Sequence, residues 1–262
     1  MALALTESDV EAIALHVFAQ LGWAVHPGEE FNTGVPGAER EDFGQVILTR
    51  RLRQAILDLN PELPAEAQEA ALRQATRPAG ASLEERNRAF HRMLTDGVPV
   101  EYQRADGHVV GAQARLVDFE NAEKNDFLTV NQLRVLGDGK LRRPDVVLFV
   151  NGLPLGVIEL KNPADENADV WKAYQQLQTY KQDIPALFEA NEVLVISDGL
   201  TARIGTLTAG REWFKPWRTI EGETLAPETV PEMEVLLRGV FEPGRFLTLL
   251  HHFIVYEVSY GK

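Results

Sequence analysis

The chain has 262 residues, of which 45% are hydrophobic, and a formal net charge of −13. This length allows one large domain or two small ones with a sizeable core, and the absence of cysteine excludes disulfides, thiolate zinc sites and a cysteine nucleophile. No stretch approaches the roughly 18 apolar residues of a membrane span, and because free-standing DNA-binding proteins are usually basic, any contact with nucleic acid needs a local basic patch or a larger assembly.

The N-terminal segment carries neither a basic stretch nor an apolar stretch of useful length, so we expect no secretory signal. Together with the absence of cysteine, this favours a cytoplasmic protein. Thr6 to Leu21 has the pattern of a helix, in which Thr6 caps the N-terminus, Asp9 completes a capping box and Gly22 offers a stop. The predicted apolar stripe of this helix contains Val10, Ile13, Ala14, Val17 and Leu21.

A helical pattern returns from about residue 45 to residue 97, interrupted by proline and glycine, and predicts a helical insertion between the first helix and a sheet. Basic residues concentrate in this segment. They are Arg50, Arg51, Arg53, Arg73, Arg77, Arg86, Arg88 and Arg92. Such residues usually cover solvated helix faces; the alternative is a surface near the phosphate backbone of a nucleic acid.

Beyond Val98 the apolar period becomes strand-like, with short β-rich runs separated by turn residues. The predicted elements are strands within 100–103, 111–119 and 127–135, a hairpin over 142–163, a helix from Ala168 to Phe188 that Pro185 kinks or ends, strands over 193–199 and 201–207, and an apolar helical tail over 233–256. This order predicts an α/β fold in which 1–262 form one domain.

The hairpin contains charged residues in strands that otherwise look buried. Strands reading VVLFV and LGVIEL are apolar enough to be covered on both faces, and an ionised carboxylate buried without a partner is costly. Glu159 therefore needs a cation, a hydrogen-bond network or a water-filled cleft. Lys161 lies two residues further on and points to the same face, whereas Leu160 between them points into the core.

Whether Asp145 shares that face depends on the turn. A two-residue type I′ loop at Asn151-Gly152 leaves the carboxylates of Asp145 and Glu159 facing apart. A three-residue loop over 150–152 with a G1 bulge puts both on one face, and a bulge near Pro144 restores the same parity. We expect one of the two arrangements that contain a bulge.

Two converging carboxylates are suited to Mg²⁺, which binds through one or two carboxylates plus water and substrate phosphate. A metal there acts as a Lewis acid and generates a hydroxide-like nucleophile. Asp145 and Glu159 are the predicted metal ligands, and the carbonyl of Leu160 could complete the coordination. The reaction class implied is hydrolysis of a phosphodiester. The structural alternative is a pair of carboxylates in salt bridges with Arg142 or Arg143.

The pattern Pro144-Asp145 followed by Glu159-Leu160-Lys161 resembles the PD-(D/E)xK nuclease superfamily. Gln176 and Tyr180, four residues apart on the next predicted helix and hence on one face, resemble the Gln-x-x-x-Tyr motif of its RecB-like members. Asp138-Gly139-Lys140 has the form of the second motif, but we expect it to be a turn. The resemblance implies a restriction-endonuclease-like fold, with a mixed central sheet flanked by helices and a helical insertion over about 45–97.

The segments 125–135, 142–163 and 244–257, and also 50–64 and 87–102, are similar to the N-terminal nuclease domain of the restriction and motor (R) subunit of type I restriction enzymes. In that family the tail, here about 233–262, leads into an ATP-driven translocase, but this chain contains no G-x-x-x-x-G-K-[ST] phosphate loop. The resemblance therefore implies a piece of a longer polypeptide in which only the absent motor needs ATP. It implies double-stranded DNA and the modification and specificity subunits as partners.

The resemblance also implies roles for single residues. Lys161 acts on the attacking water or the scissile phosphate. Gln176 and Tyr180 contact DNA or orient the lysine, the alternative being an amphipathic helix that only packs on the sheet. Family members use an acidic residue of the first helix near the metal; Glu11 is the candidate here, and Glu7 competes with it.

Other polar residues give weaker signals. Asn131-Gln132 is expected beside the site on the preceding strand, or else in sheet-edge hydrogen bonds. The six histidines show no metal-binding spacing, and His251-His252 is expected to pack in the apolar tail. The absence of a Gly-x-Ser-x-Gly elbow removes support for a serine hydrolase.

These features predict a type I site-specific deoxyribonuclease that uses Mg²⁺, for which Mn²⁺ can substitute. By resemblance, it cleaves double-stranded DNA when ATP-driven translocation stalls, without a sequence preference of its own. One rival is a non-catalytic module of the same fold for DNA tethering or subunit docking. The other rival is a DNA-repair nuclease of the same superfamily. No membrane partner is expected.

Overall fold

A six-stranded mixed sheet forms the centre of the computed structural model, which describes residues 6–35, 38–162 and 170–257. The strands, in spatial order, are β1 (Ala24–Pro27), β4 (Phe127–Asn131), β7 (Val146–Val150), β8 (Leu153–Leu160), β9 (Val193–Ser197) and β10 (Ala202–Gly205). The pairs β1–β4 and β8–β9 are parallel, and the other neighbours are antiparallel. The expected α/β fold with a mixed central sheet flanked by helices is confirmed.

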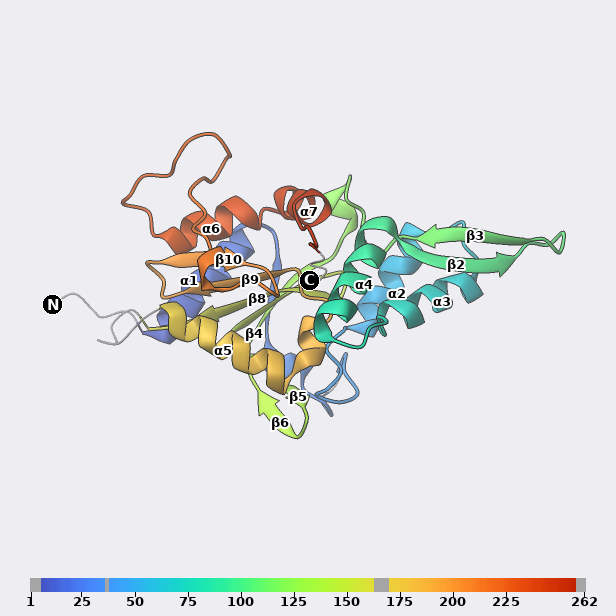
Figure 1. Cartoon of the computed structure of the whole chain (residues 1–262), viewed down its shortest axis with the longest axis horizontal. Helices are drawn as coiled ribbons and strands as arrows, with labels where there is room; N and C mark the ends of the chain where they lie inside the picture. The colour runs from blue at the N-terminus through green and yellow to red at the C-terminus, as the bar shows by residue number, and fades with distance from the viewer. Residues whose placement is uncertain (1–5, 36–37, 163–169, 258–262) are drawn as a thin grey trace, which may run out of the picture.

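Helices pack along this sheet (Figure 1). The helix α5 (Val170–Asp183) packs on β8 and β9 and lies below the strands in the view, whereas α6 (Glu232–Val240) and α7 (Pro243–His252) lie above them. The first helix, α1 (Glu7–Gln20), packs on β1, β4 and β8 and against α6. Short 3₁₀ turns span Gly28–Phe31 (η1), Ala122–Lys124 (η2), Pro185–Phe188 (η3) and Arg211–Trp213 (η4).

The start of α1 agrees with the prediction, but its buried face does not agree fully. The Thr6 side chain accepts a hydrogen bond from the backbone N–H of Asp9, whose carboxylate accepts one from the N–H of Thr6, as in a capping box. The predicted stripe is wrong at Ile13, which is 40% exposed. The buried face instead turns toward Phe18, which packs against Trp23 and Phe241.

The helical segment after α1 contains α2 (Thr49–Leu59), α3 (Ala65–Ala75) and α4 (Leu83–Asp96). A hairpin of β2 (Val98–Gln103) and β3 (Val109–Ala114) follows and projects away from the sheet in Figure 1. Several arginines of these helices form ion pairs: Arg51 with Glu39 and Asp126, Arg53 with Glu69, and Arg86 with Glu189. The charges of these three arginines are neutralised locally, as the structural interpretation expects, and the alternative of a surface near phosphate stays open for the other basic residues of the segment.

Two later segments differ from their predicted bounds. The predicted helix from Ala168 appears as α5 from Val170, its first two residues lying outside the described ones, and η3 begins at Pro185, which cannot continue an α-helix. The apolar tail is two helices, because Pro243 starts α7 and the Glu242 carboxylate caps it. Residues beyond 257 are not described. Within the described ranges, no helix is both long and apolar enough to cross a membrane.

The hairpin of β7 and β8 has a different irregularity from the predicted ones. Its turn has two residues, Asn151 and Gly152, both with positive φ, as in a type I′ turn. The register then shifts at Leu155, which is an extra residue on β8 between the pairs Phe149–Pro154 and Leu148–Gly156. The predictions of a three-residue loop and of a bulge near Pro144 are therefore wrong. Because Val146 pairs with Ile158, the register continued by one residue sets Asp145 opposite Glu159.

The core lies around these two strands, whose residues are all buried. One contiguous set of buried apolar side chains extends from Val10 on α1 through the helical insertion to Leu250 on α7. Since strands covered on both faces carry continuous apolar runs, the VVLFV and LGVIEL sequences match this environment. The carboxylate of Glu159, at the end of β8, is therefore surrounded by packed apolar side chains and shielded from solvent.

Candidate active site

Asp145 and Glu159 lie at the same end of the β7–β8 hairpin. The Glu159 residue is 0% exposed and Asp145 is 6% exposed. The Oδ2 atom of Asp145 accepts a hydrogen bond from the backbone N–H of Leu160 at 2.8 Å, which ties the carboxylate of one strand to the end of the other. The bulge at Leu155 thus places the side chains of Asp145 and Glu159 on the same face of the hairpin.

Lys161 completes this arrangement from the end of β8. Its Nζ donates to Oε1 of Glu159 at 2.9 Å and to the carbonyl oxygen of Leu160 at 2.8 Å. The side chain is only partly exposed, so the ammonium group is held against the Glu159 carboxylate rather than extended into solvent.

The ends of β8 and β9 are joined at this point, because the backbone N–H of Lys161 donates to the carbonyl oxygen of Ser197 at 2.9 Å. The strand that carries Glu159 and leads into Lys161 is therefore paired on both sides, with β7 and with β9. Groups held on rigid paired strands keep their relative positions better than groups on loops.

The electrostatic environment opposes ionisation of both carboxyl groups. Burial, followed by the neighbouring charge of Asp145, raises the pKa of Glu159 well above its ordinary value, and Lys161 only partly opposes this effect. Burial also raises the pKa of Asp145, against the hydrogen bond from Leu160 and the charge of Lys161. Two close carboxyl groups in a buried site favour a bound cation, because it removes the penalty on the charged forms.

Gln132 links these groups to the first helix. Its side-chain Nε2 donates to Oδ1 of Asp145 at 3.2 Å and to Oε2 of Glu11, while Asn131 donates to the other oxygen of Glu11 at 2.8 Å. Gln132 has a positive φ of 54°, an uncommon conformation for a residue other than glycine. A Cβ atom on Gly28 would come within 2.5 Å of the Gln132 carbonyl oxygen, so the close approach of these two backbones requires glycine there.

The candidates Gln176 and Tyr180 also contact each other. The Gln176 side chain donates to the Tyr180 hydroxyl at 2.6 Å, and that hydroxyl lies 3.5 Å from the carbonyl oxygen of Arg143. Burial and then the charge of Glu159 raise the pKa of Tyr180. This pair therefore lies next to the segment that leads into β7 and contains Asp145, and the charges of both carboxylates act on Tyr180.

The donor set is compatible with Mg²⁺. The Oε2 atom of Glu159 is buried and has no hydrogen-bond partner, which is an oxygen that a cation could take. Among residues 6–35, 38–162 and 170–257 there is no group of three or more His, Cys, Asp or Glu side chains able to hold a metal. A cation at this site would therefore use the oxygens of Asp145 and Glu159 together with water and phosphate, as Mg²⁺ commonly does.

The structure also places the competing candidates. Arg142 pairs with Asp183 rather than with Asp145 or Glu159. The Asp138-Gly139 segment is the turn between the short strands β5 (Val135–Gly137) and β6 (Lys140–Arg142), as expected. Glu7 acts on Asp145 only as a nearby charge. His251 stacks on Phe119 at the end of α7, away from the carboxylates in the fold.

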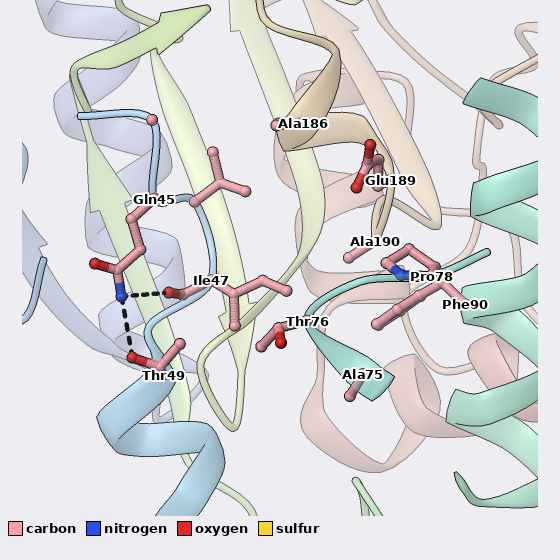
Figure 2. Close-up of a pocket in the computed structure, with 12 residues that line it drawn as sticks. Gln45, Ile47, Thr49, Ala75, Thr76, Pro78, Phe90, Ala186, Glu189 and Ala190 are labelled. Carbon is pink, nitrogen blue, oxygen red and sulfur yellow. Dashed lines mark hydrogen bonds between the residues drawn. The ribbon is translucent and has the colours of Figure 1, made fainter. Parts of the chain in front are cut away.

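A cavity of about 170 Å³ lies elsewhere, between the loop before α2, the end of α3 and η3. Figure 2 shows the Gln45 amide beside it, donating to the Ile47 carbonyl and the Thr49 hydroxyl. Its lining contains one charged side chain, Glu189, which pairs with Arg86. Without convergent polar groups, this cavity offers no chemistry comparable with that of the carboxylate site.

If Asp145 and Glu159 bind a cation, replacing Gln132 by alanine is expected to weaken Mn²⁺ binding about tenfold, because partners that orient metal ligands typically contribute 10–100-fold to affinity. The loss of its amide frees both Asp145 and Glu11. Titration calorimetry measures the change, with Gln182→Ala on the exposed side of α5 as the matched control. Unchanged affinity in the Gln132 variant would show that the carboxylates keep their positions without it.

Comparison with known proteins shows which proteins the chain as a whole resembles. The family model described as "Type I restriction enzyme R protein N terminus" matches residues 4–213. The type I restriction enzyme HindI endonuclease subunit of Haemophilus influenzae is 38% identical over 262 residues, which cover 98% of this chain and 25% of that protein. The putative type I restriction enzyme MjaIXP endonuclease subunit of Methanocaldococcus jannaschii is 30% identical over 267 residues, with 95% and 25% coverage. The chain thus spans about a quarter of the length of these relatives.

Proposed function

Because this chain belongs to the family of type I restriction enzyme R protein N-terminal regions, we propose that it is a nuclease domain that hydrolyses phosphodiester bonds of double-stranded DNA. The observation that carries this proposal is the buried Glu159 carboxylate. It has one oxygen without a partner, a second carboxylate from Asp145 on the neighbouring strand, and the Lys161 ammonium at 2.9 Å. A buried group of this kind fits a cation and a phosphate better than a structural role.

Asp145 and Glu159 would hold Mg²⁺, or Mn²⁺ in its place. When bound, such a cation supplies Lewis-acid polarisation of the phosphate and lowers the pKa of water. In the reaction, a water oxygen forms a bond to phosphorus, the bond to the leaving ester oxygen breaks, and a proton reaches that oxygen.

The chain's own residues would position these groups. Lys161 can exchange its contact with the Leu160 carbonyl for one with the attacking water or a phosphate oxygen, which offsets the charge that develops there. Glu11 and Gln132 hold Asp145 in place from the α1 side. Gln176 holds the Tyr180 hydroxyl near the Arg143 carbonyl, just before β7, and both side chains can donate hydrogen bonds to the DNA backbone.

The remaining parts of the proposal concern a longer polypeptide. In the complete enzyme, ATP-driven translocation by motor domains outside this chain would trigger cleavage, and modification and specificity subunits would supply recognition of the DNA sequence. This arrangement also accommodates the net charge of −13, because other parts of the assembly would hold the DNA. The domain prediction, a nuclease unit over 1–262, belongs to the same proposal.

Cation binding provides the direct test. Titration of Mn²⁺ by calorimetry is expected to detect a site in the unchanged protein that Asp145→Ala and Glu159→Ala both remove. Asp118→Ala is a matched control, because Asp118 is a buried carboxylate that accepts a hydrogen bond from the backbone N–H of Asn121 and pairs with Lys124. This measurement needs neither a motor nor DNA.

Identical Mn²⁺ binding by the unchanged protein and both site variants would contradict the proposal, because the two carboxylates would then share no cation. Cleavage of plasmid DNA by the full-length protein provides the second readout. Its loss in the Asp145 and Glu159 variants, with retention in the Asp118 variant, is the expected result.

A further inference from the structure

The chain after β10 runs back along α5. Leu207 accepts a hydrogen bond from Lys181 at 2.5 Å, Ala209 accepts one from the Tyr174 hydroxyl at 3.3 Å, and Arg211 then lies over Trp171. As the chain proceeds from Leu207 to Arg211, its contacts on α5 shift from the C-terminal half of the helix to its first turn. Residues 207–213 therefore lie beside the helix that carries Gln176 and Tyr180.

This segment gathers aromatic rings and cations into one cluster. The Arg211 guanidinium lies 5.6 Å from the ring centre of Trp171 and 5.7 Å from that of Tyr174, and Lys215 lies 5.8 Å from the ring centre of Trp213. We refer to these five residues as the α5 patch. Trp213 is 67% exposed, which is unusual for a residue with so large a ring.

The cations of the α5 patch keep their charges available. Within the described part of the chain, neither Arg211 nor Lys215 forms an ion pair with a carboxylate. The Arg211 guanidinium lies near two aromatic rings, which restricts its side chain and lowers the entropic cost of presenting its N–H groups. The exposed Glu212 lies between them in sequence, and its carboxylate is folded over Gly210.

The α5 patch lies on the opposite flank of α5 from Gln176 and Tyr180, which adjoin the carboxylate site. Trp171 and Gln176 are five residues apart on α5, which corresponds to a rise of about 7.5 Å along the helix and a rotation of about 140° around it. Successive phosphates on one DNA strand are about 3.4 Å apart along the duplex axis. A duplex that extends from Gln176 and Tyr180 across α5 would bring phosphates a few nucleotides away toward Arg211 and Lys215.

The geometry points to the α5 patch as a binding site for the DNA backbone beside the cleavage site, with Arg211 and Lys215 on phosphates and Trp213 against sugar or base edges. This inference rests on the proposed nuclease function and deepens it by naming where the substrate is held. Proteins that bind nucleic acids combine cations, which contact phosphates, with aromatic rings, which stack on bases.

A protein partner fits the α5 patch less well. Protein interfaces are enriched in tryptophan, tyrosine and arginine, but their cores are depleted of lysine and glutamate. The exposed Trp213 ring is flanked by Glu212 and Lys215, and its apolar neighbour Phe214 is buried. The chain as a whole is acidic, so two available cations beside α5 would give a local attraction for phosphate that the net charge of the chain opposes elsewhere.

The test is binding of a short fluorescein-labelled DNA duplex by the full-length protein, followed by anisotropy with EDTA present so that no cleavage occurs. The double variant Arg211→Gln/Lys215→Gln is expected to bind about tenfold more weakly or worse. Its slope of log affinity against log salt should fall by about two, since each phosphate contact contributes about 0.9. Trp213→Ala should weaken binding about fivefold, whereas Trp213→Phe should retain it.

The matched control is Arg77→Gln/Arg104→Gln, which removes the same charge from exposed positions on the helical insertion and its hairpin. Equal affinities for the two double variants, or no duplex binding by the unchanged protein at low salt, would overturn the inference. Unaltered DNA affinity combined with failure to assemble with other subunits would assign the α5 patch to protein docking.

The outcome for the α5 patch is separate from the outcome for the nuclease. Weaker binding in the patch variant, combined with no Mg²⁺-dependent cleavage by the unchanged protein, would support the α5 patch and remove the nuclease assignment. Cleavage by the unchanged protein, combined with unaltered DNA binding in the patch variant, would support the nuclease assignment and overturn the inference about the α5 patch.

Discussion

Glu159→Gln is expected to reduce Mg²⁺-dependent cleavage at least about 100-fold and, at the same time, to stabilise the metal-free protein at mildly alkaline pH. The first effect follows because a neutral amide is a poor ligand for a hard cation, and a few kcal/mol of transition-state stabilisation correspond to such a rate loss. The gain in stability follows because the substitution removes a carboxylate whose charged form is destabilised by burial. Glu159 is 0% exposed, and its Oε2 has no hydrogen-bond partner.

The pH dependence of stability distinguishes this explanation from others. Burial and the charge of Asp145 hold the pKa of Glu159 well above its ordinary value. The folded protein therefore retains a proton that the unfolded chain loses near pH ~4.3, and the free energy of unfolding falls as the pH rises from there to the folded-state pKa. The glutamine variant lacks this loss. Its advantage should grow with pH to about 1 kcal/mol, or about 2–4 °C in melting temperature for a chain of this size.

Glu192→Gln is the matched control for cleavage. Glu192 is also buried and burial raises its pKa, but it precedes β9 and contacts His91. Its variant should cleave normally. Adding Mg²⁺ should stabilise the unchanged protein and not the Glu159 variant, because only a bound cation shifts the folding equilibrium. Normal cleavage by Glu159→Gln would remove Glu159 as a metal ligand, and a variant less stable at every pH would show that its pair with Lys161 outweighs the burial penalty.

The fold was largely predictable because its elements carry local signals. The capping box of Thr6 and Asp9, the apolar runs of β7 and β8, and the stop at Pro185 each follow from neighbouring residues alone. The position of the bulge was not predictable in this way. An extra residue at Leu155 changes which side chains face each other, but LGVIEL reads the same with or without it, because both faces of β8 are buried.

The site was predictable in part for a similar reason. Glu159 is noticeable because an acidic residue inside an apolar strand needs an explanation. The link from Glu11 through Gln132 to Asp145 depends on a positive φ at Gln132 and on the close approach of Gly28, and neither has a local sequence signature. The same holds for the α5 patch, since Trp171 and Arg211 are forty residues apart in the sequence and meet only because the chain returns along α5.

Arg40→Lys is expected to lower the free energy of unfolding by about 3 kcal/mol, although it preserves the charge. Arg40 is 3% exposed and donates to three carbonyl oxygens, those of Gln45, Arg134 and Phe43, at 2.6, 2.8 and 2.6 Å. Burial lowers its pKa to about 10. A lysine cannot reproduce the planar fork, and each buried carbonyl left without a donor costs about 1–3 kcal/mol. Denaturant unfolding measures the change.

The same substitution should reach the carboxylate site, because Arg134 is two residues from Gln132 and Arg40 holds the chain there through the Arg134 carbonyl. Mn²⁺ affinity should therefore fall together with stability. Arg104→Lys, at the exposed tip of the β2–β3 hairpin, is the matched control and should stay within about 0.5 kcal/mol of the unchanged protein. If Arg40→Lys behaves like that control, the loop before α2 is held by its other contacts. If stability falls but Mn²⁺ affinity does not, Gln132 keeps its position through the close approach of Gly28 and the hydrogen bond from its own N–H to Asp145.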